Sequence, residues 1–67
     1  MTVAKIIEVN ASSSTSVEEA VRTGLKKVAE TVKNIQGAWI NETKVVTAAD
    51  GSIREWRVNL RVTFLVD

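Results

Sequence analysis

The chain has 67 residues, with nine Lys and Arg, eight Asp and Glu, and a net charge of +1. This balance argues against the dense basic patch of a nucleic-acid binder, and no apolar run approaches the roughly 20 residues needed to span a bilayer. The N-terminal segment lacks a signal-peptide pattern, so we expect a cytoplasmic protein with neither nucleic-acid nor membrane partners.

Small size is the main physical constraint. The length allows one domain, residues 1–67, and a domain this small buries too little surface to gain much stability alone. Cys and His are both absent, which excludes disulfides and the usual zinc sites. We therefore expect association with further copies of the chain, with an unusually well-packed monomer as the alternative.

The N-terminal part predicts a strand followed by a capped helix. Residues 3–9 are rich in Val and Ile and predict a strand with contacts on both faces. Residues 10–15 are small and polar, which is typical of a connection. Ser16 and Glu19 have capping-box spacing, in which Ser16 accepts from the Glu19 N–H and Glu19 reaches back. A register one residue earlier, or a flexible Ser-rich loop, is the alternative.

An apolar stripe at helical spacing predicts a helix from residue 17 to about residue 34. The stripe comprises Val17, Ala20, Val21, Leu25, Val28, Ala29, Val32 and Ile35. Glu18 and Arg22 have the spacing of an i,i+4 ion pair. Gly24 costs the helix interior about 1 kcal/mol relative to Ala, which suggests a close contact at that point. Gly37 is placed to end the helix in a left-handed conformation.

Two more strands are predicted over residues 38–47 and 53–66, joined by an Asp-Gly hairpin signal. The last strand alternates strictly, and its apolar face, including Trp56, is expected to form the core under the helix. Polar and apolar residues exchange sides partway along the second strand, which indicates a bulge or a change of neighbour. The predicted fold class is α+β, in the order β-α-β-β, with a three-stranded antiparallel sheet packed on one helix.

One helix can cover only one face of this sheet. The other face carries Glu55, Arg57, Asn59 and Arg61, and the predicted strands are longer than the usual five or six residues. Natural proteins cover or pair such edges and faces, so another copy of the chain is the expected cover. The polar side chains then bind between subunits or line a wet cavity; an ordinary solvated face is the alternative.

Combinations of residues that carry catalysis are missing. Without His or Cys, no Ser has a plausible base partner, and there is no Gly-rich phosphate loop. Glu18 and Glu19 at a helix start are better explained by capping than by acid–base chemistry. Asp50 has no neighbours with EF-hand spacing. We expect a protein that is not an enzyme and has no specific metal site.

Four segments, in their order and spacing, resemble the dodecin family. They are residues 5–9 (KIIEV), 17–21 (VEEAV), 29–35 (AETVKNI) and 55–64 (EWRVNLRVTF). The resemblance covers nearly the whole chain. It implies a hollow homo-oligomer, a homododecamer, that stores or buffers a flavin (FMN, FAD or riboflavin) in stacked pairs at subunit interfaces.

The resemblance also implies the residues of the binding site. In flavin-binding dodecins, a tryptophan soon after the helix stacks on the isoalloxazine ring, and a glutamine of the last strand bonds its polar edge. The tryptophan position falls near Gly37; Trp39 lies about 6–7 Å further along and projects from the same face. The glutamine position falls on Arg57, which only donates and can serve ring carbonyls or a phosphate but not the ring N–H. The implied cofactor-binding residues are Trp39, Arg57 and Gly37.

Three functions remain open from the sequence. In the first, a dodecin-type assembly sequesters a flavin or a similar small aromatic ligand, with Trp39 stacking and Arg57 at the polar edge. In the second, the same assembly is flavin-free, Trp39 anchors a subunit interface, and the cavity holds ions or another small ligand. In the third, a monomer binds proteins through an exposed strand edge.

Overall fold

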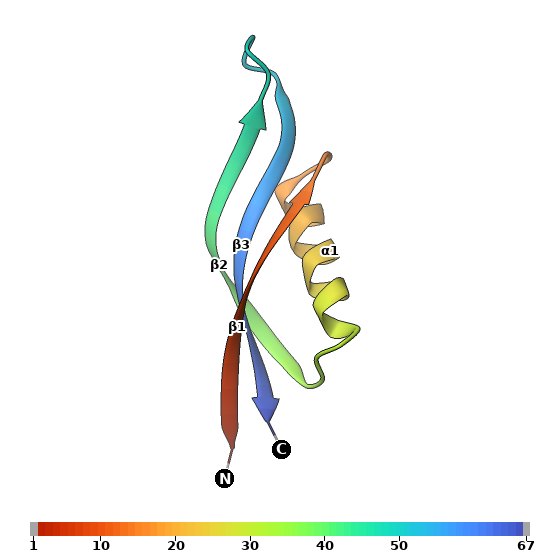
Figure 1. The fold of residues 1–67 in the computed structure, drawn as a ribbon, viewed down its shortest axis with the longest axis vertical. Coiled ribbons are helices and arrows are strands. Elements are labelled where there is room, and N and C mark those ends of the chain that lie inside the picture. The colour runs from red at the N-terminus through yellow and green to blue at the C-terminus, as the bar shows by residue number, and fades with distance from the viewer. Residues whose placement is uncertain (1, 67) are drawn as a thin grey trace.

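The protein is described by a computed structural model covering residues 2–66. Its elements are β1 (Val3–Ser13), α1 (Val17–Ala29), β2 (Ile35–Thr47) and β3 (Ile53–Val66). The strands form one antiparallel sheet in the order β1-β3-β2, so β3 is the central strand. The helix lies against one face of this sheet (Figure 1). The predicted α+β class and element order are confirmed.

The molecule is long and thin. Its principal extents are 53 × 19 × 13 Å and its Cα radius of gyration is 13.8 Å, against about 11 Å for a compact domain of this length. The β2–β3 hairpin extends beyond the helix at one end, and both chain ends lie at the other (Figure 1). The short helix therefore leaves much of the sheet uncovered. This helix, within residues 2–66, lacks the length and apolar character to cross a membrane.

The core is small and comes mainly from β3. Val58, Leu60 and Val62 are buried there, together with Ala20 of the helix. Partly buried side chains pack around them: Ile7, Val9, Ala11, Val17, Val21, Leu25, Val28 and Ile35. The predicted packing of the alternating apolar face against the helix is confirmed.

Trp56 is not part of this core. It is only half-buried, although it lies on the same face of β3 as Val58. Its neighbours across the sheet are Ser13, the last residue of β1, and Val45 of β2. Trp56 therefore lies at the level where the chain leaves β1 and turns toward the helix, so nothing covers it fully.

β1 is longer than predicted. It continues through residues 10–13 because these residues pair with residues 56–59 of β3. Pairing with a long central strand therefore outweighs the small, polar composition that is typical of a connection.

The helix is shorter than predicted. It ends at Ala29, where the N–H groups of Thr31 and Val32 both bond to the Val28 carbonyl. The residue in a left-handed conformation is Asn34, with φ 63°. Ile35 already belongs to β2, although it also fits the apolar spacing of the helix, because it pairs with β3.

The expectation that Gly37 ends the helix is wrong. Gly37 lies inside β2, opposite Thr63, next to a register shift between Ile35 and Gly37. The physical reason is that the chain already pairs with β3 at Ile35, before residue 37 is reached. The helix has already ended when Gly37 is reached.

The predicted irregularity of the second strand is confirmed. The register of β2 against β3 shifts between Ile40 and Glu42, with Asn41 as the extra residue. Ile40 lies opposite buried Leu60, while Glu42 lies opposite Asn59. The bulge thus keeps Ile40 and Val45 on the helix side while Glu42 and Lys44 lie on the opposite side.

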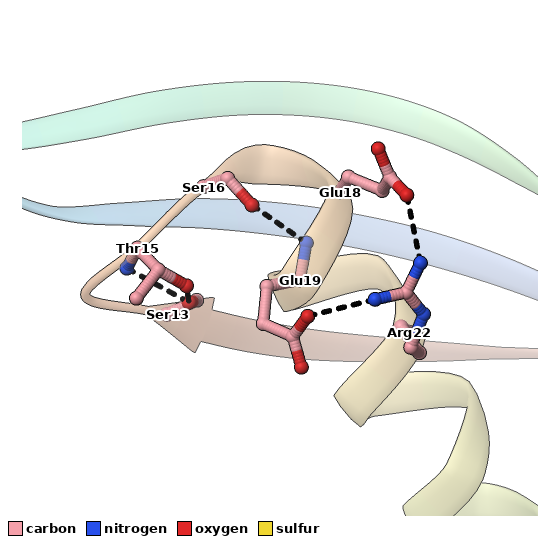
Figure 2. Close-up of polar contacts among 6 residues, drawn as sticks. All are labelled: Ser13, Thr15, Ser16, Glu18, Glu19 and Arg22. Atoms are coloured by element: carbon pink, nitrogen blue, oxygen red, sulfur yellow. Dashed lines mark hydrogen bonds and ion pairs between the residues drawn. The ribbon is translucent and has the colours of Figure 1, made fainter.

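The start of α1 is fixed by its cap. Ser16 Oγ accepts a hydrogen bond of 3.0 Å from the Glu19 N–H, as the sequence predicts. Arg22 binds Glu18 at 2.7 Å and Glu19 at 2.9 Å (Figure 2). The Glu18–Arg22 pair is confirmed, whereas the Glu19 carboxylate binds Arg22 instead of reaching back to Ser16. The ion pairs are exposed and stabilise little, so the cap is the stronger signal.

Candidate functional site

The sheet face opposite α1, called the open face below, carries the polar residues of the central strand. Side chains alternate along β3, so Arg57, Asn59 and Arg61 lie on the open face while Val58 and Leu60 are buried under the helix. Each of these three polar residues has a neighbour on β1 and one on β2. The open face is therefore organised as rows that cross all three strands.

The aromatic row contains Glu8, Arg61 and Trp39. Arg61 lies opposite Glu8 on one side and Trp39 on the other. Its guanidinium carbon is 5.9 Å from the centroid of the Trp39 ring, within the range of a cation–π contact. Trp39 is nevertheless 58% exposed. The row thus presents a large aromatic surface with a cation beside it.

The amide row contains Asn10, Asn59 and Asn41, one residue from each strand. Asn59 Nδ2 donates to Asn10 Oδ1 at 2.9 Å. Asn41 Nδ2 donates to Asn59 Oδ1 at 3.3 Å. The central amide is held from both sides, so the row is a continuous hydrogen-bonded chain across the sheet.

The charged row contains Ser12, Arg57 and Lys44. Arg57 lies opposite Ser12 and Lys44, and its Nε donates to the Glu55 carboxylate on the same strand. A groove of about 460 Å³ runs over the charged row and over Asn10 and Asn59 of the amide row, with Glu42 at its side. Its lining therefore offers amides, one carboxylate and two cations within reach of one small molecule.

The three residues implied by the resemblance all lie on the open face but not together. Arg57 and Arg61 are four residues apart on β3, which separates the charged and aromatic rows by about 13 Å. Gly37 lies opposite Thr63, on the far side of the aromatic row from Arg57. The cation beside Trp39 is therefore Arg61, and Arg57 reaches the same ligand only if that ligand is long or another subunit brings Arg57 to it.

The sequence interpretation missed two residues of this face. Asn10 falls in a segment predicted to be a connection, and the bulge at Asn41 hides the face on which that residue lies. The signal in the sequence is Asn59, a single amide between two arginines on the polar face, because its side chain can bond to amides on both neighbouring strands.

The hairpin between β2 and β3 holds a carboxyl group whose pKa is shifted. Asp50 Oδ1 accepts from Ser52 Oγ at 2.7 Å and from the Ser52 N–H at 3.0 Å. These bonds lower the pKa of Asp50 below its ordinary value of 3.8 because they stabilise the carboxylate. Over residues 2–66, no three acidic side chains gather into a group that would hold a metal ion.

Comparisons with known proteins agree with the fold. A family model described as dodecin matches residues 3–67. A comparison with curated protein sequences gave no match. The structure of a dodecin from Streptomyces davaonensis is similar, with 24% identity, a TM-score of 0.91, and coverage of 98% of this chain and 96% of that one.

Two further solved structures are similar. A single-substitution variant of the Thermus thermophilus dodecin has 22% identity and a TM-score of 0.92, and the match covers 100% of this chain and 98% of that one. A protein named calcium dodecin, a calcium-chelating antigen from Mycobacterium tuberculosis, has 28% identity and a TM-score of 0.82, with coverage of 97% and 91%.

Proposed function

Because the chain belongs to the dodecin family, a family of small-ligand-binding proteins, we propose that it is a homo-oligomer that binds and sequesters a flavin-class ring on its open face. The ligand is FMN, FAD or riboflavin, and the protein catalyses no reaction on it. Neither His nor Cys occurs in the chain, in agreement with a binding role.

The observation that carries this proposal is the solvent exposure of the Trp39 side chain. A tryptophan usually buries a large apolar area, yet Trp39 is 58% exposed on an otherwise polar face. Arg61, the residue that pairs with Trp39 across the two strands, contacts the indole ring and helps to hold its orientation. An exposed, oriented aromatic side chain beside hydrogen-bonding groups suits a planar, polar-edged ligand better than a purely apolar one.

The proposed assembly is supported by β2, the strand that the helix leaves bare. α1 packs on β1 and β3, while nearly every residue of β2 is exposed. Ile40 and Val45 are 53% and 42% exposed, although they pair with apolar residues of β3 and lie on the same side of the sheet as α1. Covering this strand with another copy removes apolar surface from water and blocks an open sheet edge.

A flavin-free assembly that binds an ion is the second candidate. The observation in its favour is the 28% identity to the calcium-chelating antigen. The charges of the open face are balanced between acids (Glu8, Glu42, Glu55) and bases (Lys44, Arg57, Arg61). Net charge therefore favours neither a cation nor an anion, and the exposed aromatic ring makes the planar ligand the better-supported choice.

The test is a fluorescence titration of riboflavin with the purified protein, with the oligomer mass measured by light scattering. Binding should quench the flavin, and Trp39→Ala should weaken binding by about 1–3 kcal/mol, as for other aromatic stacking platforms. Trp39→Phe keeps a ring and should retain more binding. Trp56→Phe is the matched control, because Trp56 lies on the opposite face of the sheet.

Two results would count against the proposal. Unchanged riboflavin fluorescence at micromolar protein would refute flavin binding. Equal affinity of Trp39→Ala and wild type would refute the assignment of Trp39 to the binding site. Calorimetric titration with calcium chloride, in parallel, separates the ion-binding candidate. A monomeric mass would refute the assembly independently of either ligand.

A further inference from the structure

We propose that the amide row, Asn10, Asn59 and Asn41, selects the ligand by reading an imide edge, an N–H between two ring carbonyls. This inference rests on the proposed function and adds to it the groups that determine specificity. The row's chemistry and its distance from Trp39 carry the inference.

The amide row lies within reach of a ring stacked on Trp39. Asn41 is two residues from Trp39 along β2, and Asn59 is two residues from Arg61 along β3. Along β3, two residues amount to about 6–7 Å on the same face, and Asn41, the bulge residue of β2, is held beside Asn59 by its hydrogen bond of 3.3 Å. A fused three-ring system that covers Trp39 and extends along the strands therefore brings its polar edge to Asn41 and Asn59.

The hydrogen bonds within the row leave complementary groups available. Asn41 Nδ2 and Asn59 Nδ2 each commit one N–H to a neighbouring amide, and each amide nitrogen carries two. Asn41 Oδ1 takes no part in these two bonds. Asn41 thus retains an acceptor for a ring N–H and a donor for a ring carbonyl, side by side on one planar group.

The charged side chains of the open face cannot supply this pair from a single group. Arg57, Arg61 and Lys44 only donate, and the ionised Glu42 carboxylate only accepts. A ligand edge that alternates carbonyl, N–H and carbonyl is satisfied by an amide, whereas cations alone leave its N–H without a partner. An unmatched polar group in a desolvated site lowers affinity strongly.

The row is also organised before the ligand arrives. Asn59 is bonded on both sides, at 2.9 Å to Asn10 and 3.3 Å to Asn41, so the three side chains restrict one another. Less rotamer freedom remains to be lost on binding, which favours affinity for a ligand of matching edge.

The experiment compares lumiflavin with 3-methyllumiflavin, which has the same rings but a methyl group in place of the imide hydrogen. We expect the wild-type protein to bind lumiflavin at least about tenfold more tightly, the scale of one matched hydrogen bond. Asn41→Leu should weaken lumiflavin binding, leave 3-methyllumiflavin binding nearly unchanged, and bring the affinity ratio close to one. Gln36→Leu, which removes an exposed amide from β2 outside the row, should keep the wild-type ratio.

The outcomes distinguish failure of the proposed flavin binding from failure of the role given to the amide row. If lumiflavin does not bind at all, the proposed function fails and this inference falls with it. If both flavins bind wild type equally, or if Asn41→Leu keeps the preference, the inference alone is overturned. Light scattering checks that each variant keeps its mass; should Asn41→Leu lose it, Asn41→Ser, whose shorter hydroxyl cannot span the row, replaces it.

Discussion

Gly24 of α1 lies directly against Ala11 of β1. A β-carbon added to Gly24 would stand 2.8 Å from the Ala11 β-carbon and 3.3 Å from Leu60 Cδ1, and 2.8 Å is closer than real β-carbons approach. The glycine therefore permits close contact between helix and sheet. This explains a residue that otherwise weakens the helix interior by about 1 kcal/mol.

Gly24→Ala should destabilise the protein despite improving helix propensity. The added methyl forces the helix away from β1 or distorts the sheet, and overpacking of this kind costs about 1–3 kcal/mol. Urea unfolding at a fixed protein concentration measures the change. Thr23→Ala, at the exposed neighbouring position, should change the unfolding free energy by less than about 0.5 kcal/mol.

A double substitution tests the cause of that loss. Ala11→Gly removes the β-carbon that Gly24→Ala would meet, so the two changes together should cost less than the sum of their separate effects. Strict additivity would show that the Ala11 contact is not the source of the destabilisation.

Ser16→Ala should lower the unfolding free energy by about 1 kcal/mol, the usual cost of losing an N-cap. The reason is that the Glu19 N–H would lose its 3.0 Å acceptor. Thermal unfolding followed by circular dichroism measures the loss. Ser14→Ala, at the exposed serine two residues earlier, is the matched control, and an equal effect of the two changes would contradict the capping role.

The hairpin turn should become less stable in acid. The pKa of Asp50 is lowered in the folded protein by its hydrogen bonds from Ser52, so the carboxylate stabilises the turn above the ordinary pKa of 3.8. This contribution is lost as the pH falls through the lower, folded-state pKa. A titration followed by NMR of the Asp50 carboxyl carbon should show a midpoint below 3.8 in wild type and a higher one in Ser52→Ala. Identical midpoints would exclude Ser52 as the cause.

Ile40→Asp should break the proposed assembly. Ile40 is 53% exposed in the single chain, and a charge in a buried interface between copies would be strongly unfavourable. Light scattering should report a loss of mass. Thr23→Asp places the same charge on the exposed side of α1 and should leave the mass unchanged. Retention of the native mass by Ile40→Asp would mean that the bare side of β2 is not the interface.

The sequence predicted those elements whose local signals and tertiary partners agree. The last strand alternates strictly and lies at the centre of the sheet, so its bounds and the face that packs under the helix were predicted correctly, although Trp56 on that face is only half-buried. The Ser16 cap and the Glu18–Arg22 pair involve only residues near one another in the chain, and both were identified. The bulge in β2 was visible as a change of side in the apolar pattern.

The errors occur where a distant partner decides the local structure. Residues 10–13 become strand because β3 pairs with them, and residues 30–34 leave the helix because Ile35 must meet Phe64. The candidate site depended on register in the same way. Trp39, Arg57 and Gly37 do share one face, but only the pairing shows that Arg61 is the cation beside the indole and that three asparagines meet across the sheet.

The position of β3 in the chain also constrains when the protein can fold. β1 and β2 each pair with β3 and not with each other, and three of the four buried apolar side chains found within residues 2–66 belong to β3. A nascent polypeptide that ends before residue 53 thus has a helix and two strands with no sheet to join. The sheet and its core therefore cannot assemble during translation until β3 has been synthesised.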